Sequence, residues 1–176
     1  YKFSTTDKNN ITEAYSHDYY IRHSEARADF LLIPENHRIE FGVNSVLYDL
    51  NRGDILPFGV ESNRIPVYLG NEQGLENSAY ISDEIKLHQR LTLLAGLRYS
   101  YYMLLGPVDV SQYVPGLPMN KDNIVDIEHF GRGSAAKKYS GLEPRAAINY
   151  RAGRNTSVKA SYNRLRQYLF LLSNTI

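Results

Sequence analysis

The 176-residue sequence contains no cysteine and no tryptophan. Without cysteine, disulfide scaffolds, thiol catalysis and cysteine-based zinc sites are excluded. Long apolar runs are also lacking, because LTLLAGL and YLFLL fall far short of the roughly 18 residues of a transmembrane helix. The charges nearly balance at a net +1 and form no basic stripe, which argues against nucleic acid as a partner.

Signals for export and for catalysis are missing as well. The first residues, YKFSTTDKNN, lack the basic, apolar and small-residue segments of a signal peptide. The sequence has no nucleophile elbow, P-loop, His-Glu-x-x-His motif or dinucleotide fingerprint. We therefore do not expect an enzyme, and we expect no cofactor.

What the sequence does have is tyrosine, 15 residues, together with a period-two alternation of apolar and polar side chains. In the stretch 91–102 the odd positions are apolar or aromatic, and most even positions are polar or small. A β-strand places two such sets on opposite faces. The alternation predicts strands in residues 25–32, 39–44, 78–87, 91–102, 142–150 and 157–163, with a further strand end in residues 1–6.

Two local features complicate this pattern. Pro144 cannot donate a ladder hydrogen bond, so we expect it near the start of its strand. Helical spacing of apolar residues competes with strand in two stretches, 85–94 and 165–172. For the first stretch, Gly96 and the alternation after Leu91 favour strand; for the second, both interpretations stay open.

The predicted strands are joined by connections of two lengths. Short turns are expected at residues 34–37, 88–90 and 152–155, and long irregular stretches at about 51–77 and 106–138. Loops of the latter length are uncommon in compact domains. Short turns that alternate with long loops are typical of transmembrane barrels, whose periplasmic turns are short and whose extracellular loops are long.

Every predicted strand also has a polar face opposite its apolar face, and no amphipathic helix of sufficient length is available to cover the apolar one. A barrel in a membrane turns its apolar face to lipid and its polar face to a wet lumen. A soluble β-sandwich shows the same alternation and is the alternative fold.

Three segments carry a family resemblance: YISDEIKLHQRLTLLAGLRYS at 80–100, LEPRAAINYR at 142–151 and SYNRLRQYLFLLSNT at 161–175. In this order and spacing they resemble the barrel of TonB-dependent outer-membrane receptors of the Bacteroidetes type. The resemblance implies an all-β, antiparallel transmembrane barrel of roughly 22 strands. About six or seven of those strands would come from this chain, which makes the chain a partial barrel.

The resemblance also implies a role and a setting. Residues 1–176 would be part of one β-barrel domain, with the plug domain and signal peptide elsewhere in a longer polypeptide. The receptor would bind a scarce nutrient at the surface of a Gram-negative bacterium and import it with energy transmitted by TonB. Its implied partners are outer-membrane lipid, the TonB complex reached through parts outside this chain, the unidentified nutrient and a surface lipoprotein. A non-energised porin or a structural or adhesive β protein is the alternative.

Candidate binding residues lie on the polar strand face and in the loops. Arg98, Glu143 and Arg145 would face the lumen on neighbouring strands, where they form a cross-strand salt bridge or contact the plug or substrate. Tyr68 and Tyr113, in the long loops, could stack on sugars or other ligands.

Metal sites are weakly indicated. Asp122, Asp126 and Glu128 lie near His129 in the second long loop, without the regular spacing of a calcium loop, so a solvated loop is the simpler interpretation. His23 and Glu25 share a strand face and would supply half a site at most.

Overall fold

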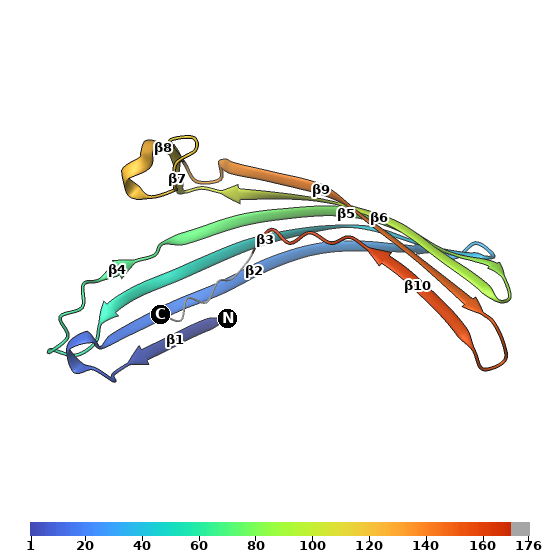
Figure 1. Cartoon of the computed structure of the whole chain (residues 1–176), viewed down its shortest axis with the longest axis horizontal. Helices are drawn as coiled ribbons and strands as arrows, with labels where there is room; N and C mark the ends of the chain where they lie inside the picture. The colour runs from blue at the N-terminus through green and yellow to red at the C-terminus, as the bar shows by residue number, and fades with distance from the viewer. Residues whose placement is uncertain (170–176) are drawn as a thin grey trace. The chain divides into compact units, whose positions relative to one another are not determined.

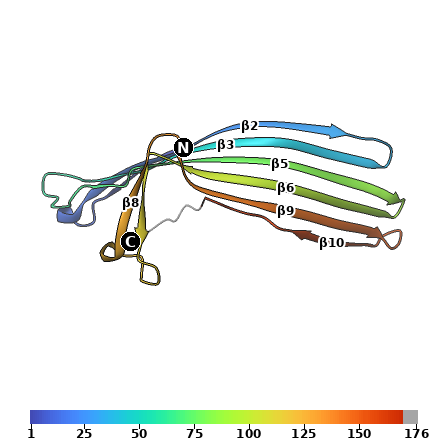
Figure 2. The same cartoon turned by 90° about the horizontal axis from the view of Figure 1, so that it is seen from above.

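A computed structural model gives the arrangement of the chain and describes residues 1–169. The chain is an all-β protein whose strands follow one another in a meander, β1-β2-β3-β5-β6-β9-β10, with β4 paired to β3 and with β7 and β8 in a sheet of their own (Figures 1 and 2). Within the described residues the main sheet stays open, with β1 and β10 as its two end strands. The elements are β1 (Lys2–Asp7), η1 (Ile11–Glu13), β2 (Tyr15–Leu32), β3 (His37–Pro57), β4 (Val67–Tyr68), β5 (Asn71–His88), β6 (Leu91–Leu105), β7 (Val108–Tyr113), η2 (Lys121–Asn123), β8 (Ile124–Phe130), β9 (Ala135–Arg151) and β10 (Ser157–Asn163).

Each of the predicted strands is present, and most are longer than the alternation indicated. The stretch 85–94, where helical spacing competed, belongs to β5 and β6. Residues 164–169 form neither helix nor strand, and the rest of the second ambiguous stretch lies outside the described residues. Among residues 1–169, no helix is both long and apolar enough to cross a membrane.

The short turns are confirmed, and the prediction of long irregular loops is partly wrong. The turn between β2 and β3 is closed by the His37 N–H, which donates to the Pro34 carbonyl at 2.8 Å. The first long stretch, however, includes the end of β3, β4 and the start of β5, and the second contains a β7–β8 hairpin. These residues pair with a neighbouring strand or with each other, which satisfies backbone groups that an irregular loop would leave to water.

Pro144 lies in the middle of β9 rather than near its start, so that prediction is wrong. The ladder between β9 and β10 ends at the Arg145–Asn163 pair, and one step further the Arg164 N–H donates to the Pro144 carbonyl at 3.1 Å. Pro144 has no N–H to return a bond on this side. The proline therefore sits where strand pairing with β10 stops, which is why β9 tolerates it.

By its contacts the chain divides into two compact units. The second unit comprises residues 25–46, 76–102 and 138 onward, and contains the three short turns. On the apolar face of its strands, large hydrophobic side chains are openly exposed. They are Phe30, Leu32, Val43, Ile81, Leu87, Leu97, Tyr99, Leu142, Ile148, Tyr150, Val158 and Tyr162. Soluble proteins rarely expose an apolar band this extensive to water.

The opposite face of the second unit is polar, and its side chains reach across strands. The Tyr80 hydroxyl on β5 donates to Asp29 Oδ1 on β2 at 2.6 Å, and Arg27 also binds Asp29. Between them on β3 lies Gly42, where a Cβ would stand 2.6 Å from the Ala28 carbonyl oxygen and 2.9 Å from Tyr80 Cε1. The missing side chain of Gly42 makes this cross-strand contact sterically feasible.

The first unit, residues 1–24, 47–75 and 103–137, contains the longer connections. The segment after β3 folds onto the η1 turn: the Phe58 N–H and the Ser62 hydroxyl both donate to the Ala14 carbonyl, at 3.0 and 2.6 Å. The Arg64 guanidinium stacks over the Tyr15 ring at 4.3 Å. Ala14 is 4% exposed, so these connections have a small packed centre of their own.

Candidate functional site

Among the described residues of the second unit, the most enclosed polar group lies on the polar face of β6 and β9. Ser100 is fully buried and Glu143 is 3% exposed. The Ser100 hydroxyl donates to Glu143 Oε1 at 2.6 Å and lies 2.9 Å from the Tyr168 hydroxyl, which comes from the segment after β10. Burying a carboxylate is costly unless it is hydrogen-bonded, and the Ser100 hydroxyl supplies one such bond.

Tyr168, which contacts this pair, belongs to a group of three neighbouring tyrosine rings. The Tyr168 ring stacks on Tyr102 with centroids 5.6 Å apart and planes at 12°, and it lies 6.4 Å from Tyr139. Tyr102 and Tyr139 are themselves 6.5 Å apart. Offset-stacked rings at these separations are favourable beyond the area they bury. Together, Ser100, Tyr102, Tyr139, Glu143 and Tyr168 form what we call the tyrosine cluster.

An ion pair lies on the same polar face. Arg98 contacts Glu76 of β5 at 3.4 Å, with the two side chains 31% and 20% exposed, while the Arg98 Nε is buried and has no hydrogen-bond partner among the described residues. Arg145 crosses β6 at Gly96, where a Cβ would stand 2.8 Å from Arg145 Cγ. The face therefore presents several charged groups, as the polar interior of a barrel does.

The three strand candidates from the sequence thus share one face of the second unit, with different partners from those expected. Arg98 forms a cross-strand ion pair with Glu76 instead of Glu143, and Glu143 accepts from Ser100. Sequence alternation placed Ser100 and Tyr102 on the polar side of β6 but gave no reason to single them out. Tyr168 was missed because nothing in the sequence shows that the chain after β10 lies on this face.

The loop candidates lie in the first unit and are not gathered into a site. Tyr68 is 72% exposed and pairs with Asp54 across β3 and β4. Tyr113 ends β7 opposite Ile124, beside a register shift. Either ring is available for stacking, but neither forms a cluster with the other.

The acidic residues of the second long connection are also dispersed. Asp122 lies in η2, and Asp126 and Glu128 lie on β8 opposite Gln112 and Val110. Among residues 1–169, no group of three metal-ligating side chains is arranged to hold an ion. This finding applies to the acidic residues of the second connection and also to His23 and Glu25. Asp126 and Glu128 are two residues apart on β8 and share one of its faces, but Asp122, in η2, does not complete a group of three with them.

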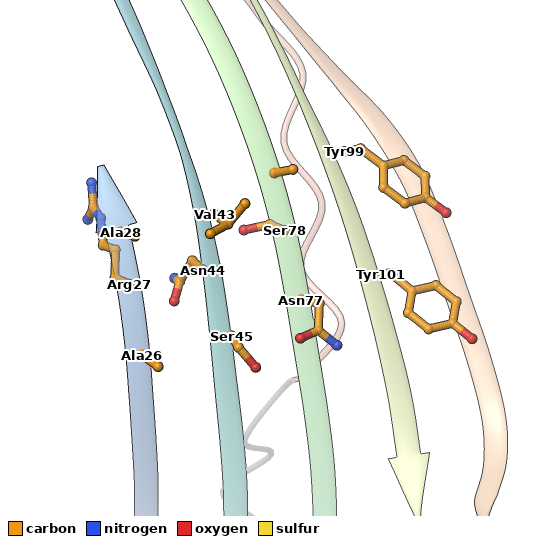
Figure 3. Close-up of a pocket in the computed structure, with 11 residues that line it drawn as sticks. Ala26, Arg27, Ala28, Val43, Asn44, Ser45, Asn77, Ser78, Tyr99 and Tyr101 are labelled. Atoms are coloured by element: carbon orange, nitrogen blue, oxygen red, sulfur yellow. The ribbon is translucent and has the colours of Figure 1, made fainter. Parts of the chain in front are cut away.

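A shallow, open depression of about 830 Å³ lies in the second unit, across β2, β3, β5 and β6. Figure 3 shows the small side chains on its floor, including Ala26, Ala28 and Ser45, and the rings of Tyr99 and Tyr101 along β6. Its lining is mainly apolar. A depression of this kind on the apolar face offers few groups that could do chemistry.

The family comparison agrees with this architecture. The family described as TonB dependent receptor-like, beta-barrel matches residues 1–166. No curated protein matches the chain. Among solved structures, the chain is similar to the closed form of the ferric-catecholate import receptor Fiu from E. coli K12, with a TM-score of 0.46 and 14% identity over 91% of this chain and 26% of that receptor.

The match thus spans about a quarter of the length of that receptor. The family match covers all of the strands from β1 to β10. An antiparallel meander with an exposed apolar face and a polar face lined with fixed charges is the architecture of a barrel wall. The chain belongs to the TonB-dependent receptor family and is part of its β-barrel.

Proposed function

We propose that this chain forms part of the wall of an outer-membrane receptor that binds a nutrient at the cell surface and imports it with energy transmitted by TonB. The observation that carries the proposal is the pair of faces in the second unit. Hydrophobic side chains such as Ile81 and Val158 are 56% and 59% exposed, while the reverse face holds Glu143 and the Arg98–Glu76 pair.

Lipid explains this arrangement better than water does. Burial of apolar area in hydrocarbon stabilises by about 25 cal/mol per Å², and no described residue of the second unit covers the exposed side chains of this face. Polar side chains on the other face would meet a wet lumen, where their charges avoid the desolvation cost of a dry core. A transmembrane strand needs about 9–11 residues, and the main strands supply at least 15 each, except for the end strands β1 and β10.

Several finer features belong to the same proposal. Residues 1–176 are one part of a single barrel domain, and the plug and the segment that contacts TonB are supplied by other parts of the receptor. The three segments noted in the sequence support a receptor of the Bacteroidetes type in the outer membrane of a Gram-negative bacterium. A receptor of that type would have a surface lipoprotein as a further partner.

The test is uptake by cells that express the complete receptor. A strain lacking the receptor gene should lose growth on one limiting nutrient in a panel that includes siderophores, vitamins, glycans and peptides. The complete gene should restore that growth, and deletion of TonB should abolish it again. Growth that persists without TonB would indicate passive diffusion through a porin and would overturn the energised part of the proposal.

The membrane part has a separate test. The purified receptor should stay monodisperse only in detergent or lipid, because its apolar face would otherwise be exposed to water. A complete receptor that is monodisperse in plain buffer would contradict the assignment of this face to lipid.

A further inference from the structure

After β10 the chain leaves the ladder and returns along the polar face of the second unit. We call residues 164–169 the strap. Its first residue is tied to the sheet by the Arg164 N–H, which donates to the Pro144 carbonyl at 3.1 Å. Further along, the Arg166 guanidinium lies directly over Gly141, where a Cβ would collide with it. The glycine leaves space for the strap to lie close to β9.

The strap ends in the tyrosine cluster. The Tyr168 ring fills a slot formed by Tyr102, which is 5% exposed, and by Tyr139, with the Ser100 hydroxyl at its end. The Tyr168 oxygen also lies 3.4 Å from the Ser100 carbonyl. The slot therefore provides ring faces for stacking and, at its far end, a buried oxygen for the ring's hydroxyl group.

The arrangement of hydrogen-bond donors and acceptors makes this slot selective for a ring that carries a donor. The Ser100 hydroxyl carries a single proton, which it donates to Glu143 Oε1. The Ser100 oxygen is then left as an acceptor toward the slot, and the group that meets it must donate. The Tyr168 hydroxyl, 2.9 Å away, can donate to this oxygen, whereas a bare aromatic ring or an ether would bring no donor to it.

The strap itself is held mainly through side chains. Leu165 is 77% exposed, and the Gln167 side chain bonds within the strap, to the Leu169 carbonyl. An element with few buried apolar contacts opens at low cost. Tyr168 is thus the principal anchor of the strap, and a ligand ring that takes its place in the slot would release the strap from the sheet.

We infer that the slot formed by Ser100, Tyr102, Tyr139 and Glu143 is a binding subsite for a hydroxylated aromatic ring. Tyr168 occupies it in this structure, and a ligand that carries a phenol group displaces the strap to enter. This inference concerns a site on the barrel wall and holds whether or not import depends on TonB.

The first experiment empties the slot in the complete, purified receptor. In Tyr168→Ala, p-cresol, which is the tyrosine side chain as a free molecule, should bind and raise the unfolding temperature. Toluene, which lacks only the hydroxyl, should bind about tenfold more weakly. The control variant Tyr162→Ala removes an exposed ring from the apolar face and should gain no p-cresol binding.

The second experiment tests the hydroxyl acceptor. In the Tyr168→Ala background, Ser100→Ala should reduce the preference of the slot for p-cresol over toluene, because only the more distant backbone carbonyl of residue 100 stays as an acceptor. Equal binding of the two probes to the folded single variant Tyr168→Ala, or no binding of either, would overturn the subsite.

The third experiment tests displacement and needs no cavity-forming variant. Trypsin cleaves after arginine, so strap opening in the parent receptor can be followed at Arg164 and Arg166. Saturating p-cresol should accelerate cleavage at these sites, and Tyr168→Phe, which keeps the ring and loses only the hydroxyl, should be cleaved faster without any probe. Cleavage rates unchanged by both would show that the strap is a fixed part of the wall and would overturn displacement.

Discussion

The substitution Ile81→Arg tests whether the apolar face contacts lipid or water. Ile81 is 56% exposed on β5 and lies seven residues before the strand ends at His88. If the short turn at that end lies at the membrane surface, seven residues tilted by about 45° rise roughly 17 Å along the membrane normal. That places Ile81 close to the middle of the hydrocarbon layer.

The expected cost follows from this depth. Arginine on the lipid face of a barrel destabilises by about 2–4 kcal/mol at the midplane and by far less near the interfaces. At about 1.4 kcal/mol per tenfold change, the folding equilibrium should fall about 30- to 1,000-fold. On a face exposed to water, the same substitution would change stability by no more than about 0.5 kcal/mol.

The assay is reversible folding of the complete receptor into lipid vesicles across a denaturant series, with the folded fraction read from heat-modifiable gel mobility. Thr92→Arg serves as the control for the added side chain, because it introduces arginine on the polar face of β6, close to the short turn, and should change stability little. Equal stabilities for Ile81→Arg, Thr92→Arg and the parent would refute the assignment of the apolar face to lipid.

Three further predictions concern the polar face and the long connections. Gly42→Ala should destabilise the receptor by about 1–3 kcal/mol in a denaturant titration, because the added Cβ would stand 2.6 Å from a backbone oxygen. The control Gly131→Ala should be near neutral in the same titration, because its Cβ would meet nothing within 4 Å. Ser100→Ala should cost about 1–3 kcal/mol, since it removes the donor to a buried carboxylate; a stability equal to the parent's would show that water replaces the hydroxyl. Asp109→Asn should leave the melting temperature unchanged, because its pair with His129 is 65% and 75% exposed on its two side chains; a clear loss would mean that this pair is shielded in the complete receptor.

Much of the fold could be predicted because strand alternation is a local signal. Stretches such as 91–102 and 142–150 repeat every two residues, and that period alone assigns side chains to faces. The extents of the strands could not be predicted. β3 continues to Pro57 and β5 begins at Asn71 through residues with little alternation, because pairing with neighbouring strands orders them there.

The candidate site was less accessible to sequence reasoning than the fold. Alternation correctly placed Arg98, Glu143 and Arg145 on one face, but the pairing partner of each depends on strand register. Register is set by the turns and by contacts across the sheet, and no single strand encodes it. The pair Arg98–Glu76 could therefore be read only from the folded chain.

The sequence by itself determined that this chain is a wall of strands with one apolar and one polar face, since both properties follow from a period of two and from the residue types that occupy it. Only the tertiary structure decided what lies on the polar face. The return of the strap, the stacking of Tyr168 on Tyr102 and the burial of Glu143 join residues from distant parts of the chain. Contacts of that kind arise from chain geometry after the strands have paired, so no local pattern records them.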